Sequence, residues 1–195
     1  METNFDHIQQ LWQSQKSQPF DLEGLINGLK KTEKKQKREL IFMAIITPLT
    51  LGIIAWSLPW EESPVLLLSW LLIAIAMVGI FGLTFKAKLS KSDNTESLSN
   101  RDFIQNQIKK LQSRYKIAST YMYVYTLLLI MGLNIAYFIL MEPFSTSTRL
   151  IIHISLSVAI LVFMHFSIKK KIKKYDKTLK PLIEQMENLL EESKN

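Results

Sequence analysis

The chain has no cysteine among its 195 residues. Disulfides, thiolate zinc sites and cysteine nucleophiles are therefore excluded, whereas the compartment is left open. Familiar catalytic sequences are missing too, because no GxSxG, HExxH, Walker A or GxGxxG pattern occurs. We therefore predict a protein that is not an enzyme and that has no cofactor and no metal site.

Charge is absent from four long stretches of the chain. No Asp, Glu, Lys or Arg occurs in residues 40–60, 63–85, 117–141 or 150–168. Crossing the ~30 Å hydrocarbon core of a bilayer takes about 20 apolar residues in a helix that rises about 1.5 Å per residue. A soluble core helix rarely needs such length without a charge facing water. The sequence predicts an all-α membrane protein with four transmembrane helices, arranged as two helical hairpins.

Lysine and arginine are distributed unevenly along the chain. All basic residues except Arg149 lie in residues 1–39, 86–116 and 169–195. Basic residues beside a span mark its cytoplasmic end, so we expect both termini and the middle loop to be cytoplasmic. The net charge of +7 is then explained by topology and by contact with anionic lipid head groups, and we expect no nucleic acid partner.

These features divide the chain into five segments. They are cytoplasmic amphipathic helices in 1–39, a transmembrane hairpin in 40–85, a cytoplasmic linker and helix in 86–118, a second transmembrane hairpin in 119–168 and a basic cytoplasmic helix in 169–195. No cleavable signal precedes Leu40, so the first span is expected to act as an uncleaved signal-anchor. Residues 25–31 align with 104–110, which suggests duplication, although any two units of basic helix and hairpin look somewhat alike.

Small residues form strips on three predicted spans. They are Ala44 and Gly52 in the first span, Ala76, Gly79 and Gly82 in the second, and Gly132 and Ala136 in the third. Small side chains let helix backbones approach closely. We predict that the first two spans pack through their strips, so that Gly79→Leu lowers stability in detergent. The same strips could also join two copies of the chain in a homo-oligomer.

A few polar residues interrupt the apolar spans. The most prominent are Asn134 in the third span and His153 and Ser157 in the fourth. Asn134 and His153 both lie toward the outer half of their spans, so we expect them to face each other. They form either a small polar site that switches or an interhelical hydrogen bond worth about 0.6 kcal/mol. Because no Asp, Glu, Lys or Arg lies inside a span, secondary active transport is disfavoured.

Four amphipathic segments flank the spans, at 3–16, 22–38, 101–116 and 176–192. Their apolar stripes either pack on one another or on the membrane surface, or they form a docking face for a soluble partner. The first segment is the best candidate for docking. It carries an apolar face of Phe5, Ile8, Leu11 and Trp12, and Pro19 separates it from the rest of the chain.

The N-terminal sequence also carries a resemblance. Residues 5–13, FDHIQQLWQ, followed by a basic helix that runs into the first span, resemble small bacterial membrane proteins encoded beside extracytoplasmic-function sigma factors. Some of these are thought to be anti-sigma factors that hold the sigma factor with N-terminal cytoplasmic helices. The resemblance implies a location in the bacterial inner membrane. This chain departs from the usual pattern in having four spans, no zinc-binding His/Cys motif and no sizeable external domain.

Two classes of function remain open from the sequence. One is a non-enzymatic membrane regulator or scaffold that docks a cytoplasmic protein through its amphipathic helices. The other is a small-solute channel or transporter subunit with a path lined by Thr50, Asn134, His153 and Ser157.

Overall fold

The computed structural model describes residues 22–61, 63–89 and 100–192, and every regular element among them is helical. The elements are α2 (Leu22–Ser57), α3 (Pro64–Lys86), α4 (Asn100–Lys116), the π-helical turn η2 (Ile117–Tyr121), α5 (Met122–Leu140), α6 (Thr146–Thr178) and α7 (Lys180–Glu192). Four helical stretches of the described chain are long and apolar enough to cross a membrane. The prediction of an all-helical protein with four membrane-length helices is therefore confirmed.

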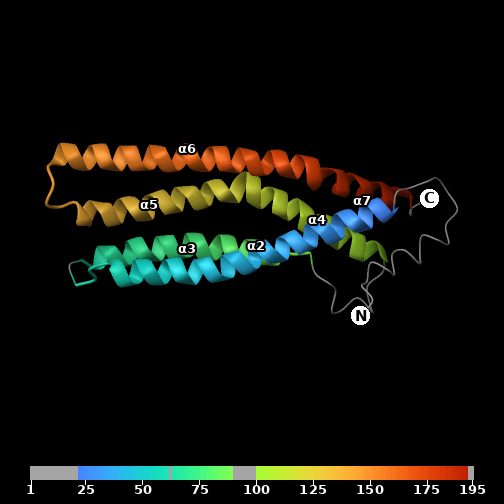
Figure 1. Ribbon diagram of the computed structural model, residues 1–195, viewed down its shortest axis with the longest axis horizontal. Helices are drawn as coiled ribbons and strands as arrows, with labels where there is room; N and C mark the ends of the chain where they lie inside the picture. Colours follow the sequence, from blue (N-terminus) through green and yellow to red (C-terminus); the bar gives the residue numbers. More distant parts are fainter. Residues whose placement is uncertain (1–21, 62, 90–99, 193–195) are drawn as a thin grey trace.

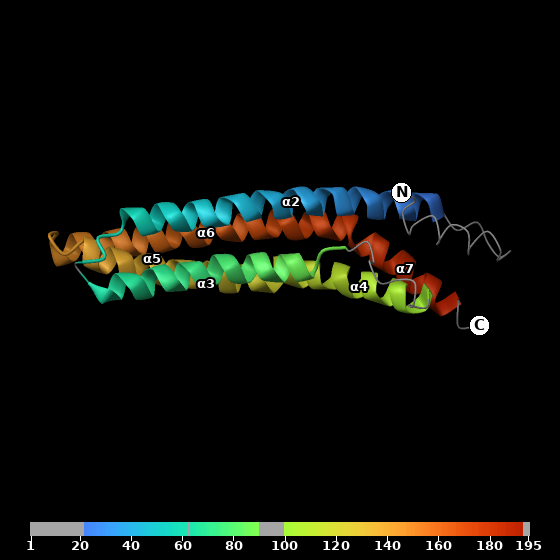
Figure 2. The same ribbon diagram turned by 90° about the horizontal axis from the view of Figure 1, so that it is seen from below.

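The long helices run side by side and give the molecule an elongated shape (Figures 1 and 2). The start of α2 and the whole of α7 lie at one end, and the α2–α3 and α5–α6 connections lie at the other (Figure 1). The most extensive contact joins α3 to α5, with α2 against α3 and α6 against α5 on either side. A pair of central helices is thus flanked by two outer helices.

Two helices continue without a break from charged sequence into uncharged sequence. The 36 residues of α2 correspond to about 54 Å of helix, so the expected helix at 22–38 and the first span form one rod. The segment 30–38 contains no glycine or proline and is rich in lysine, which favours helix, so nothing interrupts the rod there. In the same way α4 leads through η2 into α5, and the chain changes direction at that turn (Figure 1).

Several helix ends follow local capping rules. Ser63 precedes α3 with extended backbone, and its side chain accepts a hydrogen bond from the Val65 backbone N–H at 3.2 Å. Pro64 occupies the first helical position, where a missing N–H costs nothing. Pro181 likewise lies in the first turn of α7, so the C-terminal segment at 176–192 is divided between the end of α6 and α7.

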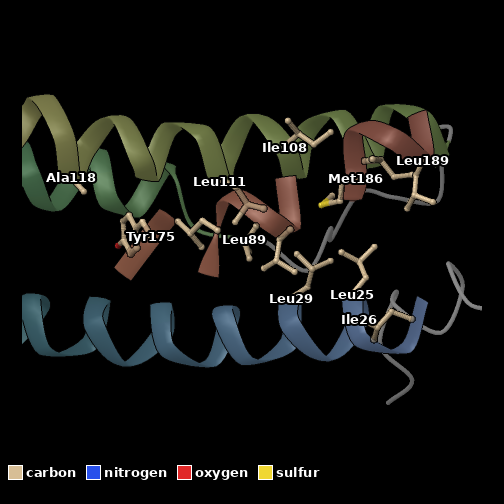
Figure 3. Close-up of a cluster of buried hydrophobic side chains, with 13 residues drawn as sticks. Leu25, Ile26, Leu29, Leu89, Ile108, Leu111, Ala118, Tyr175, Met186 and Leu189 are labelled. Atoms are coloured by element: carbon tan, nitrogen blue, oxygen red, sulfur yellow. The ribbon is translucent and has the colours of Figure 1, made fainter. Parts of the chain in front are cut away.

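At one end of the molecule the helices enclose an apolar core, shown in Figure 3. We call this part the head: α2 before Leu40, the chain after α3 as far as Leu89, α4 with Ala118 of η2, the end of α6 from Ile168 onward, and α7. Its buried cluster comprises Leu25, Ile26, Leu29, Leu89, Ile104, Ile108, Leu111, Ala118, Tyr175, Leu179, Leu182, Met186 and Leu189. The described parts of the three amphipathic segments at 22–38, 101–116 and 176–192 therefore turn apolar residues toward a common core.

The remainder, here called the span region, is built differently. Its large apolar side chains mostly point away from the protein, as Trp56 and Phe163 do with exposed fractions of 93% and 69%. The central contact buries few side chains, and several of them are small, among them Ser69, Ala76 and Ala136, together with Leu66 and Ile73 of α3. Such an outward-facing apolar surface is suited to lipid, where burial of leucine inside the protein brings no gain.

Candidate functional site

The structure brings together the three polar span residues that the sequence singles out. The Asn134 side-chain amide donates to Ser157 Oγ at 2.9 Å and to the Ile130 carbonyl at 2.8 Å. Its oxygen, Oδ1, lies 2.7 Å from Nδ1 of His153. A reversed amide would place oxygen against the Ile130 carbonyl, so the hydrogen bonds fix its orientation. The three residues therefore form one connected cluster between α5 and α6.

This arrangement also assigns the protons of His153. Because an amide oxygen only accepts, His153 Nδ1 must carry the proton in that contact. The other ring nitrogen, Nε2, is buried and has no hydrogen-bond partner. In the neutral ring Nε2 is an acceptor, and His153 lines a cavity of about 420 Å³ with Val65, Asn134, Ile135 and Phe138. The cluster can thus accept one hydrogen bond from a donor in otherwise apolar surroundings.

The predicted packing residues fall in different environments. Ala76 is buried with an exposed fraction of 4%, whereas Ala44 is exposed. A Cβ atom built on Gly52, Gly79 or Gly82 meets nothing within 4 Å. Within one chain, these three glycines therefore do not provide the close approach that the sequence led us to expect.

The close approach instead involves Gly132 on α5. A Cβ atom there would lie 2.7 Å from Ile73 Cγ1 and 3.1 Å from the Ser69 carbonyl oxygen of α3. The Ser69 hydroxyl donates to the Gly132 carbonyl at 2.8 Å, and Ser69 is fully buried. Sequence reasoning did not single out Ser69. Its steps of four and three to Ile73 and Ala76 are the signal that could have identified this face.

The predicted partner-binding residues Phe5, Ile8, Leu11 and Trp12 lie outside the described residues. The other amphipathic segments contribute to the head core described above. Their apolar stripes are consequently occupied by contacts within the chain.

The head also contains a cavity of about 400 Å³ that we call the basic pocket. It is lined by side chains of α2, α4 and α6, together with Leu182 of α7: Gly28, Lys31, Thr32, Lys35, Gln36, Glu39, Arg114, Lys174, Tyr175, Thr178, Leu179 and Leu182. Four of these side chains are lysine or arginine and one is acidic. The pocket was not predicted, because topology and contact with anionic lipid head groups already accounted for the basic residues.

The acidic residue of the basic pocket is paired with its arginine. Arg114 Nη2 donates to Glu39 Oε2 at 2.9 Å, and the arginine side chain is only 3% exposed. Gln36, also buried, uses its Oε1 to accept the Leu89 backbone N–H at 2.9 Å. The second donor group of each side chain, Arg114 Nη1 and Gln36 Nε2, is buried without a hydrogen-bond partner. Two buried polar side chains of the pocket are therefore only partly satisfied.

The lysines of the basic pocket crowd one another. The pKa of Lys35 is lowered to about 8, first by burial and then by a side-chain hydrogen bond with Lys174, while Glu39 acts in the opposite sense. Lys171, next to the pocket, also has a pKa lowered first by burial. Its ammonium lies 5.9 Å from the centre of the Tyr175 ring. The pocket thus gathers positive charge, with Lys35 partly buried and Lys31 and Lys174 at exposed positions.

The part of the chain that the structure describes contains no group of three or more His, Asp or Glu side chains able to hold a metal ion. Comparison of the chain with protein-family models, with curated proteins and with solved structures gave no match.

Proposed function

We propose that the protein is a non-enzymatic membrane regulator or scaffold that docks a cytoplasmic protein through its N-terminal segment. The observation that carries this proposal is the head core. Residues of α2, α4, α6 and α7 bury apolar side chains against one another in it, so these stripes are engaged within the chain. The remaining candidate for docking is the aromatic stripe of residues 3–16. The head would then serve as the folded base from which that segment captures its partner.

The proposal includes an orientation. We infer that the head is cytoplasmic and that the two short connections between spans lie on the other side of a bacterial inner membrane. The distribution of lysine and arginine supports this orientation. A reporter that fluoresces only in the cytoplasm should be bright when fused after Asn195 and dark when inserted at Glu62. The opposite pattern would reverse the orientation and place the docking segment outside the cell.

Capture of a partner can be tested with a matched pair of variants. Trp12→Ala removes the largest apolar side chain of the stripe, whereas Gln10→Ala changes the opposite face of the same expected helix. Large aromatic side chains dominate helix-mediated interfaces, so we expect Trp12→Ala to lose the co-purifying protein and Gln10→Ala to retain it. The N-terminal resemblance suggests an extracytoplasmic-function sigma factor as that partner.

The outcome separates docking from a structural role. If Trp12→Ala keeps its co-purifying partner but loses thermal stability, the segment belongs to the fold, and the regulator proposal loses its support. If neither variant changes capture or stability, the docking surface is elsewhere.

A second candidate is a small-solute channel or transporter subunit. The unpartnered acceptor His153 Nε2 beside its cavity favours it. Two observations argue against it. Asn134, His153 and Ser157 form hydrogen bonds mostly with one another. Thr50 lies on α2, which contacts mainly α3 and not the α5–α6 pair that carries these three residues. Solute flux into proteoliposomes that is abolished by His153→Ala would favour the channel over the regulator.

A further inference from the structure

The basic pocket has a charge imbalance that its own residues do not resolve. Lys31, Lys35, Lys174 and Arg114 carry four formal positive charges, against one negative charge on Glu39. Glu39 is already bound to Arg114 at 2.9 Å. The three lysines therefore lack a carboxylate partner among the residues that line the pocket. Lys35 is partly buried, whereas Lys31 and Lys174 lie at exposed positions of the lining, so like charges meet at the edge of the pocket and an anion there would reduce their repulsion.

The walls of the pocket supply hydrogen-bond donors in addition to charge. Arg114 and Gln36 have exposed fractions of 4% and 3%, and Arg114 Nη1 and Gln36 Nε2 have no hydrogen-bond partner, while the rest of the guanidinium interacts with Glu39 and Tyr175. A buried donor without a partner costs free energy comparable to a lost hydrogen bond. Small side-chain adjustments toward an anion would satisfy both groups. The donors come from two helices, α2 and α4, and the lysines add α6.

We propose that the basic pocket is a binding site for a phosphate-bearing anion. A phosphate offers several oxygens in different directions, which suits donors arriving from several helices better than a planar carboxylate does. The volume of about 400 Å³ lies within the range of ligand pockets and exceeds the size of a bare phosphate, so the phosphate would be attached to a larger group. Leu179 and Leu182 provide an apolar wall for that group.

The position of the pocket defines two sources for the phosphate. Glu39 directly precedes Leu40, where the first uncharged stretch begins, so one end of the pocket reaches the expected membrane surface. Lys31 lies eight residues earlier on the same helix, about 12 Å away along its axis. A lipid head group could enter from the surface end, and a soluble phosphate compound from the other. Both would meet the same lysines.

Binding at this site would connect helices that extend into the span region. An anion held by Lys35 of α2 and Lys174 of α6 turns mutual repulsion between the two side chains into shared attraction. The inference does not depend on docking by the N-terminal segment. Functional sites commonly reduce the stability of the fold, so a cluster of like charges that costs stability is consistent with a binding site.

The test uses the full chain in micelles of an uncharged detergent, with thermal unfolding as the readout. One arm adds phosphatidic acid, with diacylglycerol as the control that has the same chains without phosphate. The other arm adds inorganic pyrophosphate, with sodium chloride at equal ionic strength as the control. We expect phosphatidic acid, pyrophosphate or both to raise the Tm of the wild type by about 5 °C at saturation.

Matched variants locate the effect. Lys35→Gln with Lys174→Gln removes two charges from the pocket, and Lys37→Gln with Lys173→Gln removes two exposed charges from the same helices outside it. The pocket pair should lose the shift and should match or exceed the wild-type Tm without ligand, because repulsion is relieved. The outside pair should keep the shift. The single variant Lys31→Gln, at an exposed position of the lining, should lose part of it.

Each outcome decides the proposal. A shift with phosphatidic acid alone identifies a lipid head group, and one with pyrophosphate alone identifies a soluble phosphate compound. No shift with either compound would overturn the proposal. So would a shift that persists in the pocket pair, or one that falls equally in both pairs, because the effect would then come from general surface charge.

Discussion

The head and the span region share the helices α2 and α6 but pack their apolar side chains differently. In the head, Leu29, Leu111 and Leu189 are at most 2% exposed, and apolar side chains gather in one cluster. In the span region, Trp56 and Phe163 point outward, and α3 approaches α5 so closely that a Cβ atom on Gly132 would overlap Ile73. The supply of apolar residues does not explain this difference, because both parts contain abundant leucine and isoleucine.

The difference follows from the solvent that each part is suited to. Water drives apolar side chains together at about 25 cal/mol per Å² of buried surface, whereas lipid gives no such driving force. Helices in lipid associate through close backbone approach and a few hydrogen bonds, such as those of Ser69 and Asn134. Four experiments test whether the two parts of the molecule are stabilised in these different ways.

The largest effect is expected from the centre of the head core. Leu111→Ala should lower the free energy of unfolding by about 3 kcal/mol, because Leu111 is fully buried and its removal leaves a cavity. Leu127→Ala in α5 should change the free energy of unfolding by less than about 0.5 kcal/mol, since Leu127 is 57% exposed. Thermal unfolding in detergent measures both. Equal losses would show that the span region packs its leucines as the head does.

The close contact between α3 and α5 should give the next largest effect. Gly132→Ala introduces a Cβ atom 2.7 Å from Ile73 Cγ1, and relief of that overlap should cost about 1–3 kcal/mol. Gly79→Ala places its Cβ atom in open space and should be neutral in a single chain. The same unfolding measurement applies. A large loss at Gly79 would instead indicate that copies of the chain meet through that residue.

The polar cluster should contribute less. Asn134→Leu removes the hydrogen bonds to His153 and Ser157 while filling the same space, and interhelical hydrogen bonds of this kind contribute about 0.6 kcal/mol on average. We therefore expect a loss of about 1 kcal/mol in stability. Ser155→Ala, at an exposed position of α6, should have no effect. A gain in stability for Asn134→Leu would show that the cluster is retained for function and not for packing.

The smallest effect is expected from pH. The pKa of Lys35 falls from its usual 10.5 to about 8 in the folded protein, first through burial and then through Lys174. The charged lysine therefore destabilises the fold below pH 8, and this penalty disappears as pH rises from about 8 toward 10.5. The pKa of Lys171 is lowered too, and Glu39 opposes both shifts.

The measurement compares the Tm of the wild type and of Lys35→Gln between pH 7.5 and 9.5. The Tm of the wild type should rise relative to that of the variant over this range. Higher pH is avoided because the pKa of Tyr175 is raised by burial, so ionisation of this tyrosine in the unfolded chain would stabilise unfolding there. Parallel curves would show that Lys35 titrates alike in the folded and unfolded chain.

Much of the fold could be predicted because the absence of charged residues marks the spans so clearly. The position of Asn134 and His153 at similar depth was enough to expect their contact. The partner of each helix face could not be predicted, because spacing shows which residues share a face but not which helix covers it. Gly79 and Gly132 look alike in the sequence, yet only Gly132 lies against another helix.

The basic pocket could not be predicted for a related reason. Its cations come from α2, α4 and α6, which are far apart in the sequence and meet only in the fold. One local signal was available. Arg114 lies three residues after Leu111 and four before Ala118, on a stripe whose other members are buried. An arginine on an apolar stripe points to an internal partner, here Glu39.

The π-helical turn η2 has a consequence for the direction in which helix faces point. On one uninterrupted α-helix, at about 100° per residue, Ile104 and Leu111 of α4 would share a face with Thr126 and Ala136 of α5. A single π turn accommodates one extra residue and delays the rotation by about that angle. The buried face of α4 therefore contacts α7, and that of α5 contacts α3. Because η2 rotates the faces of α5 relative to those of α4, one continuous stripe of residues packs on α7 before the turn and on α3 after it.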